Sequence, residues 1–216
     1  MQIAAEMMMA VSLAACVGLR AWMPLLMVGL LSHAGYLSLN AHFAFLARTD
    51  TLIVLGVATV LELLGDKVIV VDHFLDAIGT VVRPAAATIL ASSMLTHTDP
   101  VVATVFGLIV GGGTALTVHS AKSVLRAKVS ALAPLHGGAG NASVSLGEDL
   151  VVAGGVLTAA HAPFIAFGVT VLLLGGAIWL LVHSVHHVRR WAGVLRNRRS
   201  SAPEPEEAPP FSTGSP

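Results

Sequence analysis

The fold is decided by residues 163–185, which read PFIAFGVTVLLLGGAIWLLVHSV. This stretch contains no Asp, Glu, Lys or Arg. A helix needs about 20 apolar residues to cross roughly 30 Å of hydrocarbon, so the stretch is long enough to span a bilayer. Similar apolar stretches precede it along most of the chain, and the sequence therefore predicts a polytopic membrane protein.

The composition agrees with this prediction. Of the 216 residues, 55% are hydrophobic and 11% are charged, whereas soluble domains carry about 25% charged residues. The first 188 residues contain only 16 Asp, Glu, Lys and Arg, too few to cover a soluble globular surface. The net charge is zero, so no nucleic-acid partner is expected. Cys16 is the single cysteine, which excludes an intrachain disulfide.

Seven apolar stretches occur along the chain, at residues 3–19, 24–39, 51–71, 84–96, 100–120, 150–162 and 163–185. Prolines start or break several of them, as expected where a helix begins or the chain turns. The second, fourth and sixth stretches are short, so each is a thin span, a re-entrant hairpin or half of a broken helix. We expect an all-α polytopic fold with about five to seven membrane segments, with room for a divergent inverted repeat.

The basic residues predict an orientation, because cytoplasmic loops carry an excess of Lys and Arg. A model with seven crossings, the N-terminus outside and the C-terminus inside, places every basic residue except Arg48 on the cytoplasmic side of a cell (inner or plasma) membrane. The chain then divides into a helical transmembrane domain (1–188), a basic juxtamembrane segment (189–199) and a disordered Pro/Glu-rich cytoplasmic tail (200–216). Residues 132–147 contain three closely spaced glycines and are predicted to form a flexible cytoplasmic loop.

The densest group of polar residues comprises Glu62, Asp66, Lys67, Asp72, Asp76, Thr80 and Arg83. The first two acids are four residues apart and share a helix face, and an acid in mid-membrane costs at least about 2.5 kcal/mol. That face must therefore point into the protein, a wet cavity or the headgroups. The later members fall on one side of an amphipathic helix, which lies along the membrane surface or folds into the protein. A snorkelling lysine, an ion pair or a helix cap would explain individual members equally well.

A second group centres on Arg20, which lies between two apolar stretches and shortly before Pro24. This pattern predicts a break between two helices. The exposed amides of the second helix, together with Arg20, could receive an anion. The alternative is that Arg20 anchors a short cytoplasmic turn.

A third group consists of His119, Lys122 and Arg126, which share a helix face at the end of the fifth stretch. Glu148 and Asp149 open the sixth stretch, where acids suit a helix N-terminus. Capping alone would explain these two acids. If the fold brings them to Arg20 or Arg83, they become interior counter-ions instead.

Together these motifs resemble the family of the domain of unknown function 4126, which consists of bacterial multi-pass membrane proteins. The resemblance covers residues 18–185, and its specific part is the middle block, Glu62-x-x-x-Asp66-Lys67-x-x-x-x-Asp72-x-x-x-Asp76-x-x-x-Thr80-x-x-Arg83-Pro84. The flanking parts are Gly18-Leu-Arg20-Ala-x-x-Pro24, His119-x-Ala-Lys122-x-x-x-Arg126 and Ser145-Leu-x-Glu148-Asp149. The sequence departs from the pattern at Ile69 and Ala142, where the family has proline. The resemblance implies a multi-pass helical fold but no reaction.

The leading functional hypothesis is a small transporter or permease-like protein with a charged site beside short helices. The four acids of the middle block would bind a cation or relay protons, and the basic residues of all three groups would face a small anionic or lipid-linked substrate. One alternative is a membrane-embedded enzyme that uses an acid pair on a lipid-linked substrate, with a divalent metal held by carboxylates and His73. The other is a non-catalytic assembly protein whose charges are structural ion pairs.

The remaining expectations concern ligands and partners. Enzymatic activity ranks below transport, and no cofactor or metal site is predicted, because the chain lacks a His-Glu-x-x-His motif and the lysine of a phosphate loop. The lipid bilayer is the expected environment. The acidic, proline-rich tail is a candidate for binding a cytoplasmic partner, and homo-oligomerisation is left open.

Overall fold

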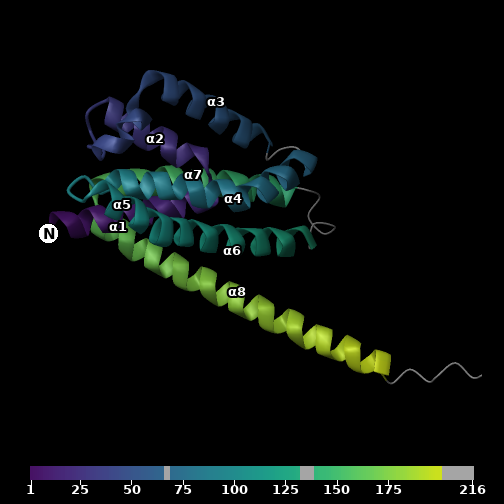
Figure 1. Cartoon of the computed structure of the whole chain (residues 1–216). Helices are drawn as coiled ribbons and strands as arrows, with labels where there is room; N and C mark the ends of the chain where they lie inside the picture. The colour runs from purple at the N-terminus through teal and green to yellow at the C-terminus, as the bar shows by residue number, and fades with distance from the viewer. Residues whose placement is uncertain (66–68, 132–138, 201–216) are drawn as a thin grey trace, which may run out of the picture. The chain divides into compact units, whose positions relative to one another are not determined.

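The structure is a computed structural model that describes residues 1–65, 69–131 and 139–200; the side chains of residues 69–76, 128–131, 139–144 and 187–200 are not part of this description. All regular secondary structure of the described residues is helical (Figure 1). Its elements are α1 (Gln2–Leu19), α2 (Trp22–His33), the 3-10 helix η1 (Ala41–Ala47), α3 (Thr49–Gly65), α4 (Ile69–Met94), α5 (Pro100–Phe106), the π-helical turn η2 (Gly107–Gly111), α6 (Gly112–Ala131), α7 (Ala139–His161) and α8 (Pro163–Ser200).

Helix α1 is the centre of the bundle and packs against α4, α6 and α7 (Figure 1). Its inner positions are mostly small, which lets neighbouring backbones approach closely, as is usual between helices in membranes. Gly18 illustrates the closeness of α1 and α6, because a Cβ atom at this position would lie 2.7 Å from the Val118 Cβ and 2.8 Å from the Ala115 oxygen. The buried core contributed by these helices includes Ala10, Leu13, Ala14 and Val17 of α1, Ala87, Leu90, Ala91 and Met94 of α4, and Val152, Val156 and Ala159 of α7.

Four helical segments of the described chain are long and apolar enough to cross a membrane, namely Gln2–Leu19, Ala77–Met94, Pro100–Ala127 and Pro163–His186. A fifth span results if η1 and α3, which meet at an angle of 62°, are counted together. Helix α2 is apolar but has only 12 residues. The last of the four long segments, on α8, is the least buried in the protein, at 11%. An apolar helix with so little protein around it is suited to contact with lipid. The expectation of an all-helical membrane fold with some short segments is confirmed.

Two expectations about individual helices are wrong. The amphipathic segment around Asp72 and the apolar stretch from Pro84 form one helix, α4, which continues through the proline. Burial of Ala86, Ala87 and Leu90 just beyond it stabilises the helix despite the backbone donor that proline lacks. The loop predicted at residues 132–147 is wrong from residue 139 on, because α7 begins at Ala139; residues 132–138 lie outside the described residues.

The chain divides into two compact units, Met1–Leu181 and Val182–Pro216. The first contains all helices up to the first half of α8, and every contact discussed below lies within it. In the second, the helical backbone of α8 continues to Ser200. The basic segment and the tail predicted at residues 189–199 and 200–216 belong to this second unit; side chains from residue 187 and the chain from residue 201 lie outside the described part.

Candidate functional site

The site is built around the break between α1 and α2. Helix α1 ends at Leu19, Arg20 has an extended backbone with φ −135° and ψ 124°, and α2 starts at Trp22. A helix end leaves carbonyl groups without partners, and a helix start leaves amides without partners. Here both kinds of group lie next to each other in the interior, so other helices must supply their hydrogen bonds.

Two cations serve the carbonyl groups at the end of α1. The Lys122 Nζ of α6 donates to the Leu19 oxygen at 2.8 Å. The Arg83 Nη1 of α4 donates to the Gly18 oxygen at 3.5 Å. Both side chains are buried. Positive charge is favourable at this end of a helix because the carbonyl dipoles leave it negative.

One carboxylate serves the amides at the start of α2. Glu62 of α3 accepts a hydrogen bond from the Ala21 nitrogen on Oε1, at 2.9 Å, and one from the Trp22 nitrogen on Oε2, at 3.2 Å. The Glu62 Oε1 also lies 3.9 Å from the Arg83 Nη2, which is a looser ion pair. Glu62 therefore acts as a helix cap supplied from another helix, and it faces the protein interior as its position in an apolar span requires.

Arg20 itself pairs with α7. Its Nη2 lies 2.8 Å from the Asp149 Oδ1 and donates to the Ser145 Oγ at 2.8 Å. The Arg20 side chain is only 1% exposed. The interpretation of Asp149 as an interior counter-ion is thus confirmed, and Arg20 is no surface anchor.

Glu148, the neighbour of Asp149, joins α7 to α6. Its Oε2 lies 2.8 Å from the Lys122 Nζ and 3.1 Å from the Arg126 Nη2. Because α7 starts at Ala139, both acids lie well inside the helix. The alternative that they cap its N-terminus is wrong, and they act as counter-ions to buried cations.

His119 extends the cluster along α6 towards α4. Its Nδ1 is hydrogen-bonded with the Arg83 Nη1, and its Nε2 lies 3.4 Å from the Thr80 Oγ1. Gly79 leaves room for this arrangement, since a Cβ atom there would lie 3.2 Å from the Arg83 Nε. The imidazole thus connects Arg83, which binds the end of α1, with the hydroxyl of Thr80 one turn earlier on α4.

The structure brings together most of the residues that the sequence singled out: Arg20, Glu62, Thr80, Arg83, His119, Lys122, Arg126, Glu148 and Asp149. We call these nine residues the charged cluster. Asp66 and Lys67 lie outside the described residues, and Asp72, His73 and Asp76 lie on α4 at positions whose side chains are not described. Within the described residues, no group of three or more His, Cys, Asp or Glu side chains is arranged to hold a metal ion.

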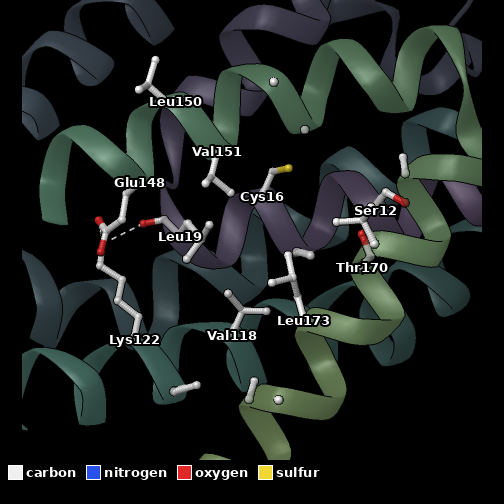
Figure 2. Close-up of a pocket in the computed structure, with 18 of the residues that line it drawn as sticks. Ser12, Cys16, Leu19, Val118, Lys122, Glu148, Leu150, Val151, Thr170 and Leu173 are labelled. Carbon is white, nitrogen blue, oxygen red and sulfur yellow. Dashed lines mark hydrogen bonds and ion pairs between the residues drawn. The ribbon is translucent and has the colours of Figure 1, made fainter.

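The charged cluster borders a pocket of about 530 Å³ between α1, α6, α7 and α8. Figure 2 shows Lys122 and Glu148 at one end of this pocket, and Leu19, Val118 and Leu173 along it. The rest of the lining is almost entirely apolar or small. The ion pair of Lys122 on α6 and Glu148 on α7 is therefore the part of the charged cluster that faces the pocket.

Sequence reasoning missed two polar contacts. Ser145 was noted only as part of a motif, although it binds Arg20. Glu6 of α1 is buried and accepts hydrogen bonds from the Thr96 Oγ1 and the His97 Nδ1, each at 2.5 Å, next to the loop that follows α4. The available signal was that Glu6 is the one acid within the first apolar stretch. No periodic pattern points to its partners.

The model of a family described as a domain of unknown function, DUF4126, matches residues 7–183. No curated protein and no solved structure matches the chain.

Proposed function

The chain belongs to the family of the domain of unknown function DUF4126, and we propose that it is a small transporter-like membrane protein that binds an anion at the break between α1 and α2. The observation that carries this proposal is the set of hydrogen bonds at the break. Charged side chains from α3, α4 and α6 bind the backbone carbonyls and amides of Gly18, Leu19, Ala21 and Trp22.

Discontinuous helices of this kind are where membrane transporters bind substrates and coupling ions. The start of α2 offers two backbone amides side by side, a common arrangement for binding phosphate or carboxylate. Glu62 occupies this position, so the carboxylate of the protein stands where the anion of a substrate would bind. The guanidinium of Arg83, 3.9 Å from the same carboxylate, would be a second contact for that anion.

Exchange of Glu62 for a substrate anion suggests coupling to protons. A proton that neutralises Glu62 weakens its bonds to the amides of Ala21 and Trp22, and the anion then takes its place. The incoming negative charge replaces the one that the proton removed, so the buried cations keep their balance. His119, hydrogen-bonded with Arg83 and Thr80, would be a group able to pass a proton on.

The orientation follows the sequence-based prediction. The basic residues of the charged cluster would lie towards the cytoplasmic side of a cell membrane, with the N-terminus outside and the C-terminus inside. The anion site would then lie nearer the cytoplasm than the hydrogen-bonded pair of Glu6 and His97.

Uptake by proteoliposomes tests the proposal. The full chain is reconstituted, and uptake of radiolabelled phosphate or sulfate is measured with and without a proton gradient. We expect uptake of at least one of the two anions, faster with the gradient. Glu62→Gln should remove the effect of the gradient because the amide cannot be protonated. The control is Asp50→Asn, which neutralises an exposed acid on the same helix and should behave as the unmodified chain.

Two results would contradict the proposal. The first is an unchanged effect of the gradient in Glu62→Gln. The second is no uptake of either anion by protein that is monodisperse and helical by circular dichroism.

A structural role is the second candidate. It is favoured by the burial of the cluster. Five of its members are at most 6% exposed and each has a bonded partner, namely Arg20, Glu62, Arg83, His119 and Lys122. In that case the charges hold the broken helix in place, and the protein serves assembly or partner binding. Loss of thermal stability in Glu62→Gln without any anion uptake by the unmodified chain would favour this candidate.

A further inference from the structure

The loop between α4 and α5, residues 95–99, is joined to α1 by a buried acid and an exposed histidine. The Glu6 Oε1 of α1 accepts from the Thr96 Oγ1 and lies 2.5 Å from the His97 Nδ1, and the Glu6 Oε2 accepts from the His97 backbone nitrogen at 3.4 Å. Glu6 is 7% exposed, whereas the His97 side chain is 53% exposed. Water therefore reaches the histidine of this pair but hardly reaches its carboxylate.

The geometry requires a proton on the His97 Nδ1. This nitrogen lies 2.5 Å from the Glu6 Oε1 and 2.8 Å from the Thr96 Oγ1. The one hydroxyl proton of Thr96 is donated to Glu6, because an ionised carboxylate only accepts hydrogen bonds. A bare Nδ1 would bring two acceptors face to face at this distance. The ring therefore carries Nδ1–H, which both the neutral imidazole and the imidazolium can provide.

The second ring nitrogen has a partner that suits both of these states. The His97 Nε2 lies 3.4 Å from the Gln2 Nε2. A side-chain amide has donors on its nitrogen and an acceptor oxygen, and turning the amide over exchanges the two. Gln2 can therefore donate to the Nε2 of a neutral ring or accept from the Nε2–H of an imidazolium, so His97 gains or loses a proton without losing this partner.

A group that does not titrate holds the rest of the loop. The Asn40 Nδ2 donates to the Leu95 oxygen at 2.8 Å and to the Thr98 oxygen at 3.4 Å, and Asn40 is 4% exposed. A change in protonation therefore acts on Thr96 and His97, while Leu95 and Thr98 stay bound to Asn40.

Other titratable groups at this end of the bundle are used elsewhere or lie in water. The Asp99 carboxylate accepts from the Val101 nitrogen and caps α5. The His161 Nδ1, at the end of α7, is bonded with the Leu157 oxygen. The groups from the N-terminus, α2, η1 and the start of α3 are all exposed: the Met1 amine, His33, Tyr36, His42, Arg48 and Asp50.

We propose that Glu6 and His97 form a pH-sensitive latch, which binds the α4–α5 loop to α1 most firmly when the His97 imidazole is protonated. A hydrogen bond between two ions is stronger than one from a neutral donor. Histidine changes its charge between about pH 5 and 8. The latch is therefore firm below this range and loosens as the pH rises through it. This latch goes beyond the proposed anion transport and does not depend on it.

Amide hydrogen exchange of the loop tests the proposal. The full chain in detergent is exchanged at about pH 6 and about pH 8, and peptides covering residues 95–99 are analysed by mass spectrometry. Each exchange rate is divided by the rate of an unfolded peptide at the same pH, which gives the protection. We expect about three- to fivefold higher protection at the lower pH, a modest change because water screens the exposed ring. Equal protection at the two pH values would overturn the proposal.

Two histidines provide a matched pair of variants. His97→Asn keeps an N–H donor near the position of Nδ1 but cannot titrate, so its protection should be the same at both pH values. His161→Asn removes another exposed histidine near a helix end and should keep the pH dependence of the unmodified chain. A dependence that persists in His97→Asn, or disappears in His161→Asn, would overturn the assignment to His97.

The carboxylate is tested by Glu6→Gln. The amide oxygen still accepts from Nδ1–H but carries no charge, so the pH dependence should fall below about twofold. A full dependence in Glu6→Gln would overturn the role of Glu6, and the exposed His97→Asn decides the proposal if Glu6→Gln does not fold. Because these experiments measure no transport, a failure of anion uptake and a failure of the latch are distinguished.

Discussion

At the scale of residues, burial distinguishes two arginine–aspartate pairs with nearly the same nitrogen–oxygen distance. Arg20 and Asp149 lie 2.8 Å apart, with side chains 1% and 24% exposed. Arg48 and Asp50 lie 2.9 Å apart, at 67% and 64% exposed. Water screens the second pair, whereas removing one partner of the first leaves a charge in the interior without this counter-ion.

A double-mutant cycle should therefore separate the two pairs. Arg20→Gln and Asp149→Asn are each expected to lower the free energy of unfolding by about 3 kcal/mol, with a coupling energy of about 1–3 kcal/mol. The measurement is unfolding in detergent followed by circular dichroism. The same cycle on Arg48 and Asp50 should give no measurable coupling, and equal couplings for the two pairs would show that burial does not control their strength.

The sequence could predict part of this residue-level arrangement. Helical spacing and the cost of a charge in lipid indicated that Glu62 faces the interior, a wet cavity or the headgroups. A counter-ion role was one of two interpretations of Asp149, with Arg20 or Arg83 as the partner. The bonds of Glu62 to the amides of Ala21 and Trp22 could not be foreseen. These contacts join residues about 40 positions apart, and they depend on how α3 packs against α2, which no local pattern encodes.

At the scale of elements, the backbones of α4 and the π-helical turn η2 approach each other closely at Gly107. A Cβ atom at Gly107 would overlap the Ser92 Oγ and lie 2.5 Å from the Thr88 oxygen. The backbone carbonyl cannot move aside without shifting α4. Gly113, further along the same span, has open space around its Cβ position.

Gly107→Ala and Gly113→Ala are predicted to have different effects on the free energy of unfolding. The first should destabilise the protein by about 1–3 kcal/mol, as overpacking does. The second should be neutral or slightly stabilising, because alanine favours a helix over glycine. Thermal unfolding of both variants in the same detergent measures the difference. A Gly107→Ala protein as stable as the unmodified chain would contradict the close packing of α4 and η2.

Element boundaries were the least predictable part of the fold. Pro84 was interpreted as a helix start, yet α4 runs through it because its flanking alanines are buried against neighbouring helices. The glycines before Asn141 suggested a loop, yet α7 already begins at Ala139. In both cases local preference and tertiary packing compete, and the sequence displays only the first.

At the scale of the whole molecule, the large number of exposed apolar side chains indicates a lipid environment. The outer positions of α8 include Leu172 at 77%, Trp179 at 66% and Ile165 at 64% exposed. A soluble monomer rarely exposes an apolar patch larger than a few hundred Å². The composition alone was sufficient to predict this property, because it depends on how few charges the chain has rather than on where they lie.

The protein should accordingly remain in the membrane fraction. After expression, we expect it in the pellet of an ultracentrifugation step, resistant to extraction with alkaline carbonate and released by detergent. A peripheral membrane protein in the same preparation, which carbonate should release, serves as the control. Folded, monodisperse protein in the supernatant without detergent would contradict the membrane assignment.

Glu148 belongs to two environments at once. Its carboxylate binds Lys122, which binds the end of α1, and it also lines the pocket between α1, α6, α7 and α8. Any ligand in this pocket and an anion at the helix break would therefore act on the same ion pair. Thermodynamic linkage then requires the effect to be reciprocal: if occupancy of the pocket alters anion affinity, anion occupancy alters the affinity of the pocket by the same factor.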